Sequence, residues 1–154
     1  MKLHPVINNH GGKLWCAHAA LSAITGLPTK DCLHYLKIAA KEVTDHPRKL
    51  RGVYTREIIR GLLHFGYEVK TIHDVFPQYR RKEPVPNNSL MHHCSYFAAD
   101  KVYLVMVPWH FIAAQGTIVS DSNFLTGIHV SNYPGKHRQV IQVWEVRNQT
   151  AGDL

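Results

Sequence analysis

Three residues of this chain have the types and the order along the sequence that build an activated cysteine nucleophile. Cys16 follows a glycine-containing loop and begins a run of small and apolar residues that favour a helix. Much later, His110 begins an apolar strand pattern, and Asp121 ends the next such pattern after a turn at Gln115-Gly116. A thiol at a helix start, with a histidine and a carboxylate on neighbouring strands, is a nucleophile with its base and its orienting group. We therefore predict a catalytic triad of Cys16, His110 and Asp121.

The chemistry of this triad depends on the ionised form of the cysteine. The thiolate is the nucleophile, and a free thiol has a pKa near ~8.5 that a helix N-terminus or an imidazolium lowers by several units. Cys16 has the helix start, and His110 would supply the imidazole. Asp121 would accept a hydrogen bond from the second ring nitrogen and so fix the tautomer. The alternative interpretation is a buried core cysteine and a histidine at a strand edge.

The remaining cysteines and histidines carry weaker signals. The chain has 3 cysteines, and an odd, small number without short paired spacing argues against a disulfide framework and a cysteine-rich zinc site. Cys32 and Cys94 lie in apolar, helical patterns, where a free cysteine behaves as a small hydrophobe. His92-His93-Cys94 are adjacent, and adjacent residues on a helix point in different directions. We therefore predict no metal and no cofactor.

Composition limits the size, the location and the partners of the protein. A length of 154 residues with 45% hydrophobic residues suits a single domain, 1–154, with one core. No window approaches the ~20 apolar residues of a membrane span, and the N-terminus lacks the apolar stretch of a signal peptide. We therefore expect a cytoplasmic protein without a membrane partner. A net charge of +7 makes nucleic acid a possible partner, but Arg80-Arg81-Lys82 lie in a proline-rich loop without an aromatic ladder, which does not favour it.

The elements that must position the triad follow a pattern of helices first and an antiparallel sheet second. Helices are predicted at 16–25, from Thr29 onward until Asp45-His46-Pro47, and from Thr55 to Gly66, with a short one after Asn88-Ser89. Strands are predicted at 67–72, 101–107, 110–114, 117–120, 128–131 and 139–146, and a long surface loop at 77–86. This order predicts an α+β fold.

The order of cysteine, histidine and aspartate, on a helix followed by a sheet, resembles the papain-like cysteine peptidase superfamily. The specific parts are Trp15-Cys16-Ala17 and Trp109-His110-Phe111-Ile112-Ala113, within a match over residues 8–124. The chain is most similar there to the small peptidase domains that remove double-glycine leaders from bacteriocins, and to their bacterial and phage relatives. The resemblance implies a papain-like fold, with the cysteine on the central helix and a C-terminal antiparallel β-sheet packed against it. Trp15 and Trp109 flank the catalytic candidates. They are interpreted as core aromatics that need no special role, although such positions would also shield the ion pair from water.

One departure from this family concerns the oxyanion hole. The family usually has a glutamine six residues before the cysteine, and its amide helps the backbone N–H of the cysteine to bind the oxyanion. His10 occupies that position here. A histidine can donate a hydrogen bond in a suitable tautomer, and Asn9 or Asn8 could donate instead if the loop differs by a residue or two. The predicted oxyanion residues are therefore His10 and Asn9, with Asn8 as a further candidate.

Three functions are compatible with these residues. The first is a cysteine peptidase that cleaves an amide bond of a peptide or protein through a thioester. The second keeps the triad but acts as an amidase, a deamidase, an isopeptidase or an acyltransferase. The third is a degenerate papain-like module that binds protein or nucleic acid. The sequence predicts no particular oligomeric state.

Overall fold

The computed structural model describes residues 1–9, 15–44 and 55–149 of the chain. Three helices come first, and short helices and strands follow. The helical segments are α1 (Cys16–Thr25), α2 (Thr29–Thr44), α3 (Thr55–His64), α4 (Phe76–Arg80), α5 (Leu90–Tyr96) and the 3-10 turn η1 (Val130–Asn132). The strands are β1 (Tyr67–Asp74), β2 (Val102–Val107), β3 (His110–Gln115), β4 (Ile118–Asp121), β5 (Phe124–His129) and β6 (Gln142–Asn148).

The strands form one 6-stranded sheet in the order β1-β6-β2-β3-β4-β5, and every neighbouring pair is antiparallel. Tight turns join β2 to β3 and β3 to β4. The start of β3, which carries His110, and the end of β4, which carries Asp121, are therefore close neighbours in the sheet. At the β3–β4 turn, Gly116 has a φ of 56°, which is the left-handed region that favours glycine. The sheet thus brings together the histidine and the aspartate that the sequence separates.

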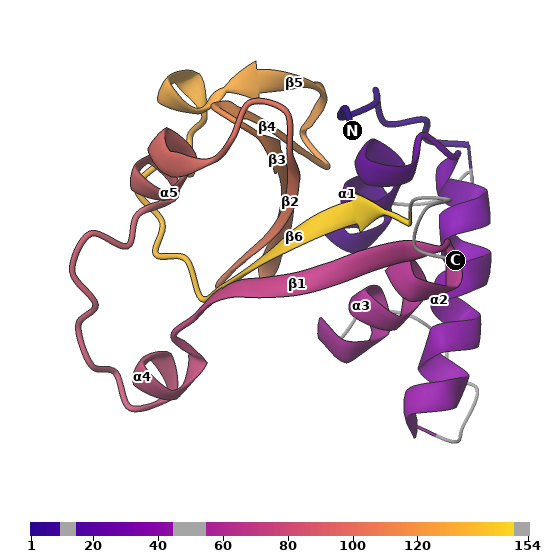
Figure 1. Cartoon of the computed structure of the whole chain (residues 1–154), viewed down its shortest axis with the longest axis horizontal. Helices are drawn as coiled ribbons and strands as arrows, with labels where there is room; N and C mark the ends of the chain where they lie inside the picture. Colours follow the sequence, from indigo (N-terminus) through magenta and orange to yellow (C-terminus); the bar gives the residue numbers. More distant parts are fainter. Residues whose placement is uncertain (10–14, 45–54, 150–154) are drawn as a thin grey trace.

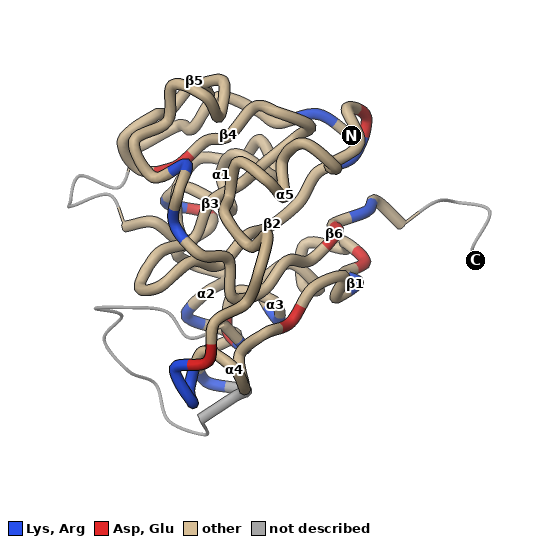
Figure 2. The backbone as a smooth tube through the Cα atoms, turned by 90° about the vertical axis from the view of Figure 1, so that its left-hand side faces the viewer, with Lys and Arg blue, Asp and Glu red and all other residues tan. Residues whose placement is uncertain are grey.

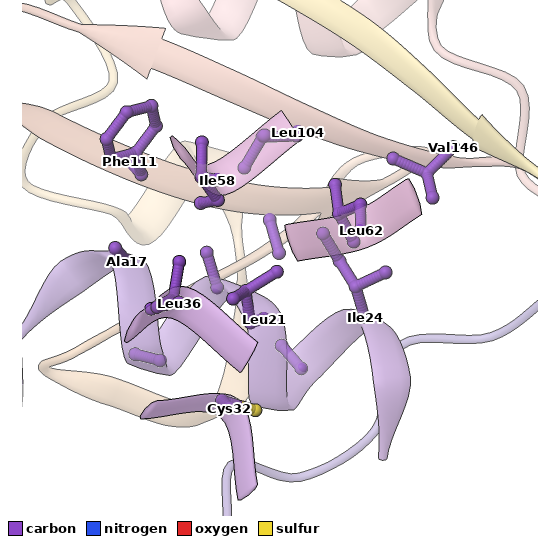
Figure 3. Close-up of a cluster of buried hydrophobic side chains, with 14 of the residues drawn as sticks. Ala17, Leu21, Ile24, Cys32, Leu36, Ile58, Leu62, Leu104, Phe111 and Val146 are labelled. Atoms are coloured by element: carbon purple, nitrogen blue, oxygen red, sulfur yellow. The ribbon is translucent and has the colours of Figure 1, made fainter. Parts of the chain in front are cut away.

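Helices α1, α2 and α3 cover one face of this sheet (Figure 1). Apolar side chains from the three helices pack against alternate residues of the central strands, as Figure 3 shows for a set that includes Leu21, Leu36, Leu62, Leu104 and Phe111. Alternation follows from the strand, because successive side chains point to opposite faces. This first cluster fixes α1 against β3 and β4, and so fixes the helix that begins at Cys16.

The opposite face of the sheet carries a second apolar cluster beneath α5 and η1. The alternate residues Tyr103, Val105, Ile112 and Val119 belong to it, together with Leu90 of α5. Both faces of β2 and β3 are therefore buried, which explains why these strands are almost continuous apolar runs rather than alternating ones.

The structure confirms the predicted α+β fold and most of its element boundaries. Ser89 caps α5 as expected, because its Oγ accepts a hydrogen bond from the backbone N–H of His92 at 3.1 Å. Two local predictions were wrong: the strand expected at 128–131 is β5 followed by η1, and the loop expected at 77–86 begins with the end of α4. The predicted helix break at Asp45-His46-Pro47 lies outside the described residues.

Two further observations concern the surface and the helices. Figure 2 shows Lys and Arg gathered at α4, where Arg80-Arg81-Lys82 lie, and Arg81 there pairs with Glu83 at 2.7 Å. Within residues 1–9, 15–44 and 55–149, no helix combines the length and the apolar character needed to cross a membrane.

Candidate active site

The thiol of Cys16 lies at the first residue of α1. Trp15, just before it, has extended backbone angles, so the helix and its free N–H groups begin at the cysteine. The backbone N–H groups of Ala17 and Phe111 both act to lower the pKa of the thiol, which places the sulfur between the helix start and β3. Its side chain is half-buried and packs on the first apolar cluster. The predicted nucleophile is therefore held by the helix and faces the strand that begins at His110.

His110 contacts both of its predicted partners. Its Nε2 lies 2.9 Å from Oδ2 of Asp121. Its ring also interacts with the thiol of Cys16 closely enough for each group to shift the pKa of the other. Because Nε2 faces the carboxylate, Nδ1 is the ring nitrogen left for the sulfur. The His110 side chain is only 17% exposed, so most of the ring is shielded from water. The structure thus brings the three residues together in the predicted order, with His110 between Cys16 and Asp121.

Asp121 ends β4 with all of its accepting positions occupied. Oδ1 accepts the backbone N–H groups of Asn123 at 2.8 Å and Phe124 at 3.0 Å, which is the local turn chemistry of aspartate. Oδ2 accepts from His110 at 2.9 Å and from the hydroxyl of Tyr133 at 2.5 Å. The side chain is buried. Four donors therefore compensate the loss of water around a buried carboxylate.

Tyr133 is a site residue that the sequence did not identify. It is buried in the second apolar cluster just beyond η1, and its hydroxyl donates to Asp121. It lies outside every strand and follows no spacing rule that links it to a cysteine or a histidine. Its contact depends on how the chain returns over the sheet after β5, so no local pattern could have indicated it.

The charges of the triad reinforce one another. Burial favours the neutral thiol of Cys16, but the hydrogen bond and charge of His110 and the two backbone N–H groups prevail and lower the pKa of Cys16. Burial also opposes protonation of His110, but Asp121 and Cys16 together raise the pKa of His110 to about 9. Burial acts to raise the pKa of Asp121, and its bonds from His110 and Tyr133 lower it overall. These directions favour a thiolate and imidazolium pair at neutral pH.

The other two cysteines provide an internal contrast. All three cysteines are free thiols. Burial raises the pKa of Cys32 to about 12, with the charge of Asp31 acting in the same direction, and burial raises the pKa of Cys94 to about 12. Both belong to apolar clusters, as their helical patterns predicted. Reactivity is therefore expected at Cys16 alone among the three.

The structure describes only two of the three predicted oxyanion donors. His10 lies outside the described residues. Asn9 lies beside the start of α2, where its Oδ1 accepts the backbone N–H of Lys30 at 3.0 Å. Asn8 lies beside the same helix, with its Oδ1 3.4 Å from Oγ1 of Thr29. Their roles stay predictions, whereas the backbone N–H of Cys16 belongs to the free first turn of α1, which favours a negative charge.

The two tryptophans beside the triad have different environments. Trp15 packs against the first cluster, and its ring stacks on that of His18 at a centroid distance of 5.2 Å. Trp109 is 96% exposed, so the prediction of a core aromatic was wrong at this position. The reason is the tight turn between β2 and β3, which places the residue beyond both faces of the sheet.

The histidines of α5 lie in a polar cluster apart from the triad. The Nε2 atoms of His73 and His93 each lie 2.9 Å from Oδ1 of Asn88, whose amide donates to the carbonyl of Val140. Burial and the neighbouring rings of His73 and His92 lower the pKa of His93 to about 4. Within the described residues, no group of three or more histidine, cysteine, aspartate or glutamate side chains has an arrangement that could hold a metal ion.

A cysteine at the start of the central helix, with its histidine and aspartate on an antiparallel sheet packed against that helix, is a papain-like arrangement. The chain matches the crystal structure of the peptidase domain of Streptococcus ComA, a bi-functional ABC transporter involved in a quorum-sensing pathway. The TM-score is 0.50 at 12% sequence identity, and the match covers 96% of this chain and 98% of that domain. No family model and no curated protein matches the sequence. The likeness confirms, at the level of the fold, the resemblance to small papain-like peptidase domains.

Proposed function

We propose that this protein is a cysteine peptidase, a thiol hydrolase that cleaves an amide bond of a peptide or protein through a thioester intermediate. The observation that carries the proposal is the continuous chain from the Cys16 thiol through His110 to Asp121, with the pKa of the thiol lowered. A structural cysteine would need neither the histidine contact nor the buried carboxylate behind it. The peptidase activity of the ComA domain, to which the fold is similar, supports a peptide as substrate.

The first half of the reaction forms the thioester. The Cys16 thiolate attacks the scissile carbonyl carbon, and the carbonyl oxygen becomes an oxyanion. The backbone N–H of Cys16 would stabilise this oxyanion, with His10 or Asn9 as the proposed second donor. When the tetrahedral intermediate collapses, the C–N bond breaks and the proton on Nδ1 of His110 passes to the leaving amine.

The second half of the reaction restores the enzyme. His110, now neutral, removes a proton from water, and the resulting hydroxide adds to the thioester carbon. Collapse breaks the C–S bond, releases the acid product and leaves the thiolate beside the protonated histidine. Asp121 stays ionised throughout and holds His110 in one orientation, because three other donors already fix the carboxylate.

The same triad would also serve an amidase, a deamidase, an isopeptidase or an acyltransferase, which differ in the amine released or in the acceptor of the acyl group. A degenerate module that binds protein or nucleic acid is a further alternative. The lowered pKa of Cys16 favours catalysis over this last possibility, because a binding module has no need of a stabilised thiolate. We therefore rank hydrolysis of a peptide first.

The experiment that tests the proposal labels the three cysteines competitively with iodoacetamide across a pH series, followed by peptide mapping. Cys16 should react well below pH 8, and faster than Cys32 and Cys94, which serve as internal controls. Incubation with a peptide library, with mass analysis of products and of a Cys16 acyl adduct, then tests turnover. Uniform slow labelling and no cleavage would favour the binding module.

A further inference from the structure

The turn that delivers His110 to the site has an unusual residue in it. Val107 pairs with His110 across β2 and β3, so the chain reverses through Pro108 and Trp109 alone. A proline at the first central position and a positive φ at the second are the type II combination, which normally requires glycine or asparagine at the second. Trp109 occupies that position with a φ of 62°. A bulky side chain therefore occupies a backbone conformation that favours glycine, and it lies one residue before His110, the proposed catalytic base.

The indole of Trp109 also lacks the burial that a tryptophan normally obtains. At 96% exposed it exceeds every other large hydrophobic side chain in the described part of the chain, with Tyr96 next at 79%. Neither the exposure of the aromatic side chain nor its strained backbone conformation stabilises the fold. Local departures of this kind are expected at functional sites, where the compensation is a contact made by the ligand.

The turn nevertheless holds the indole in a defined place. Proline fixes its own φ, and the guanidinium of Arg138 donates a hydrogen bond to the carbonyl of Pro108. On the other side, His110 is held by Cys16 and Asp121. The backbone of Trp109 is therefore fixed on both sides, about 3.8 Å in Cα separation from the residue that would protonate the leaving amine.

We infer that Trp109 is a substrate-positioning residue that packs against an apolar side chain of the peptide next to the scissile bond. The inference rests on the proposed peptidase function. A peptide whose scissile carbonyl lies at Cys16 and whose leaving nitrogen lies at His110 advances only about 3.3 Å per residue, so residues one or two positions away pass the indole. An apolar side chain fits better than a cationic one, because Arg138 lies beside the turn and the chain carries a net charge of +7.

The test compares two substitutions that separate strain from contact. Trp109→Gly suits the positive φ but removes the indole, whereas Trp109→Phe keeps an aromatic ring. The probe is a positional-scanning library of internally quenched peptides. Trp109→Gly should lower kcat/KM by about tenfold or more and flatten the preference for apolar residues at one position, as lost positioning does. Trp109→Phe should stay within about threefold of the wild type.

Two readouts show that the effect arises from the substrate contact. The thermal midpoint of Trp109→Gly should equal or exceed that of the wild type, because glycine accepts this backbone conformation. The rate of Cys16 alkylation by iodoacetamide should not change, because this reagent needs no peptide contact. Tyr96→Ala, which removes another exposed aromatic residue, is the matched control and should keep the wild-type kcat/KM. Wild-type kcat/KM and preference in Trp109→Gly would overturn the inference and leave the peptidase function standing.

A binding measurement keeps the inference testable if the wild type cleaves no peptide. Peptides of the same library are titrated into Cys16→Ala while tryptophan emission is recorded. A blue shift of the emission that Trp109→Phe abolishes supports the contact between the indole and the peptide. The absence of a shift overturns the inference. A failure to cleave peptides, by contrast, concerns the proposed function alone. A blue shift with anionic lipid vesicles, together with unchanged peptide turnover in Trp109→Gly, would identify a membrane contact instead and also overturn the inference.

Discussion

At the residue scale, the three cysteines show how surroundings decide the chemistry of one side chain. Burial disfavours the thiolate of each, yet only Cys16 has a histidine and two backbone N–H groups around its sulfur. Cys32 and Cys94 belong instead to apolar packing. A helix start alone would not produce this difference, because the contact with His110 comes from a strand far along the sequence.

Cys16→Ala should therefore abolish turnover and leave the fold intact. Loss of the nucleophile is expected to lower kcat by about 10⁴-fold or more. Cys32→Ala and Cys94→Ala, the matched controls, should keep activity and lower the free energy of unfolding by about 1–3 kcal/mol as core truncations. Peptide turnover and urea denaturation measure the two effects. Full activity in Cys16→Ala would exclude the proposed nucleophile.

The pH dependence of kcat/KM should be bell-shaped. The reactive pair needs Cys16 deprotonated and His110 protonated, so activity rises with pH through the lowered pKa of the thiol and falls again near pH 9, where His110 loses its proton. In His110→Ala, only the two backbone N–H groups still oppose the effect of burial, so the pKa of Cys16 should rise and the alkylation profile should shift to higher pH. An unchanged profile would show that the two side chains are not coupled. Asp121→Asn should be milder, because an amide oxygen still accepts from the ring.

At the element scale, the β3–β4 hairpin sets the distance between His110 and Asp121. The turn depends on Gly116, whose φ is 56° and where an added Cβ would lie 3.2 Å from the Cα of Ala99. Both the conformation and the close backbone approach oppose any larger residue. The hairpin, rather than any single contact, therefore explains why His110 and Asp121 meet.

Gly116→Ala should accordingly destabilise the protein by about 1–2 kcal/mol, the cost of a left-handed conformation for alanine. Gly61→Ala in α3 is the matched control, since its added Cβ would meet Leu36 Cδ2 at 3.6 Å, an ordinary contact in a helix where alanine is favoured. Midpoints of urea unfolding would compare the two. Equal midpoints for both variants would contradict the role assigned to the turn.

At the scale of the whole molecule, the candidate triad connects the apolar clusters on the two faces of the sheet. Cys16 packs on the cluster beneath the helices, whereas Tyr133 belongs to the cluster on the opposite face. The chain of contacts from Cys16 through His110 and Asp121 to Tyr133 joins the two clusters. The geometry of the site therefore depends on both faces being packed at once.

Tyr133→Phe tests this dependence, because it keeps the ring packed but removes the donor to Asp121. A hydrogen bond to a charged group contributes about 1.5–3 kcal/mol, so stability should fall by an amount in that range. The pKa of Asp121 should rise, and that of His110 should fall below about 9 as its partner becomes less firmly ionised. An NMR titration of the His110 ring would measure the change. A His110 titration identical to the wild type would show that Tyr133 only fills space.

Sequence patterns by themselves predicted the helices and the central strands, and indicated Cys16, His110 and Asp121 as the candidate site residues. These features are local: caps, glycine turns and apolar periodicity act over a few residues, and a histidine at a strand start can be recognised wherever its partner lies. The burial of β2 and β3 on both faces, found in the structure, agrees with their almost continuous apolar runs.

Only the tertiary structure decided the contact of Tyr133 with Asp121 and the exposure of Trp109. Each depends on segments far apart in the chain being brought together, or on a turn that places a residue beyond the packed sheet. An apolar side chain such as that of Trp109 predicts burial on average, but the two-residue turn at its position leaves no core to enter. Local propensity fixes what a segment becomes, whereas packing determines which side chains meet.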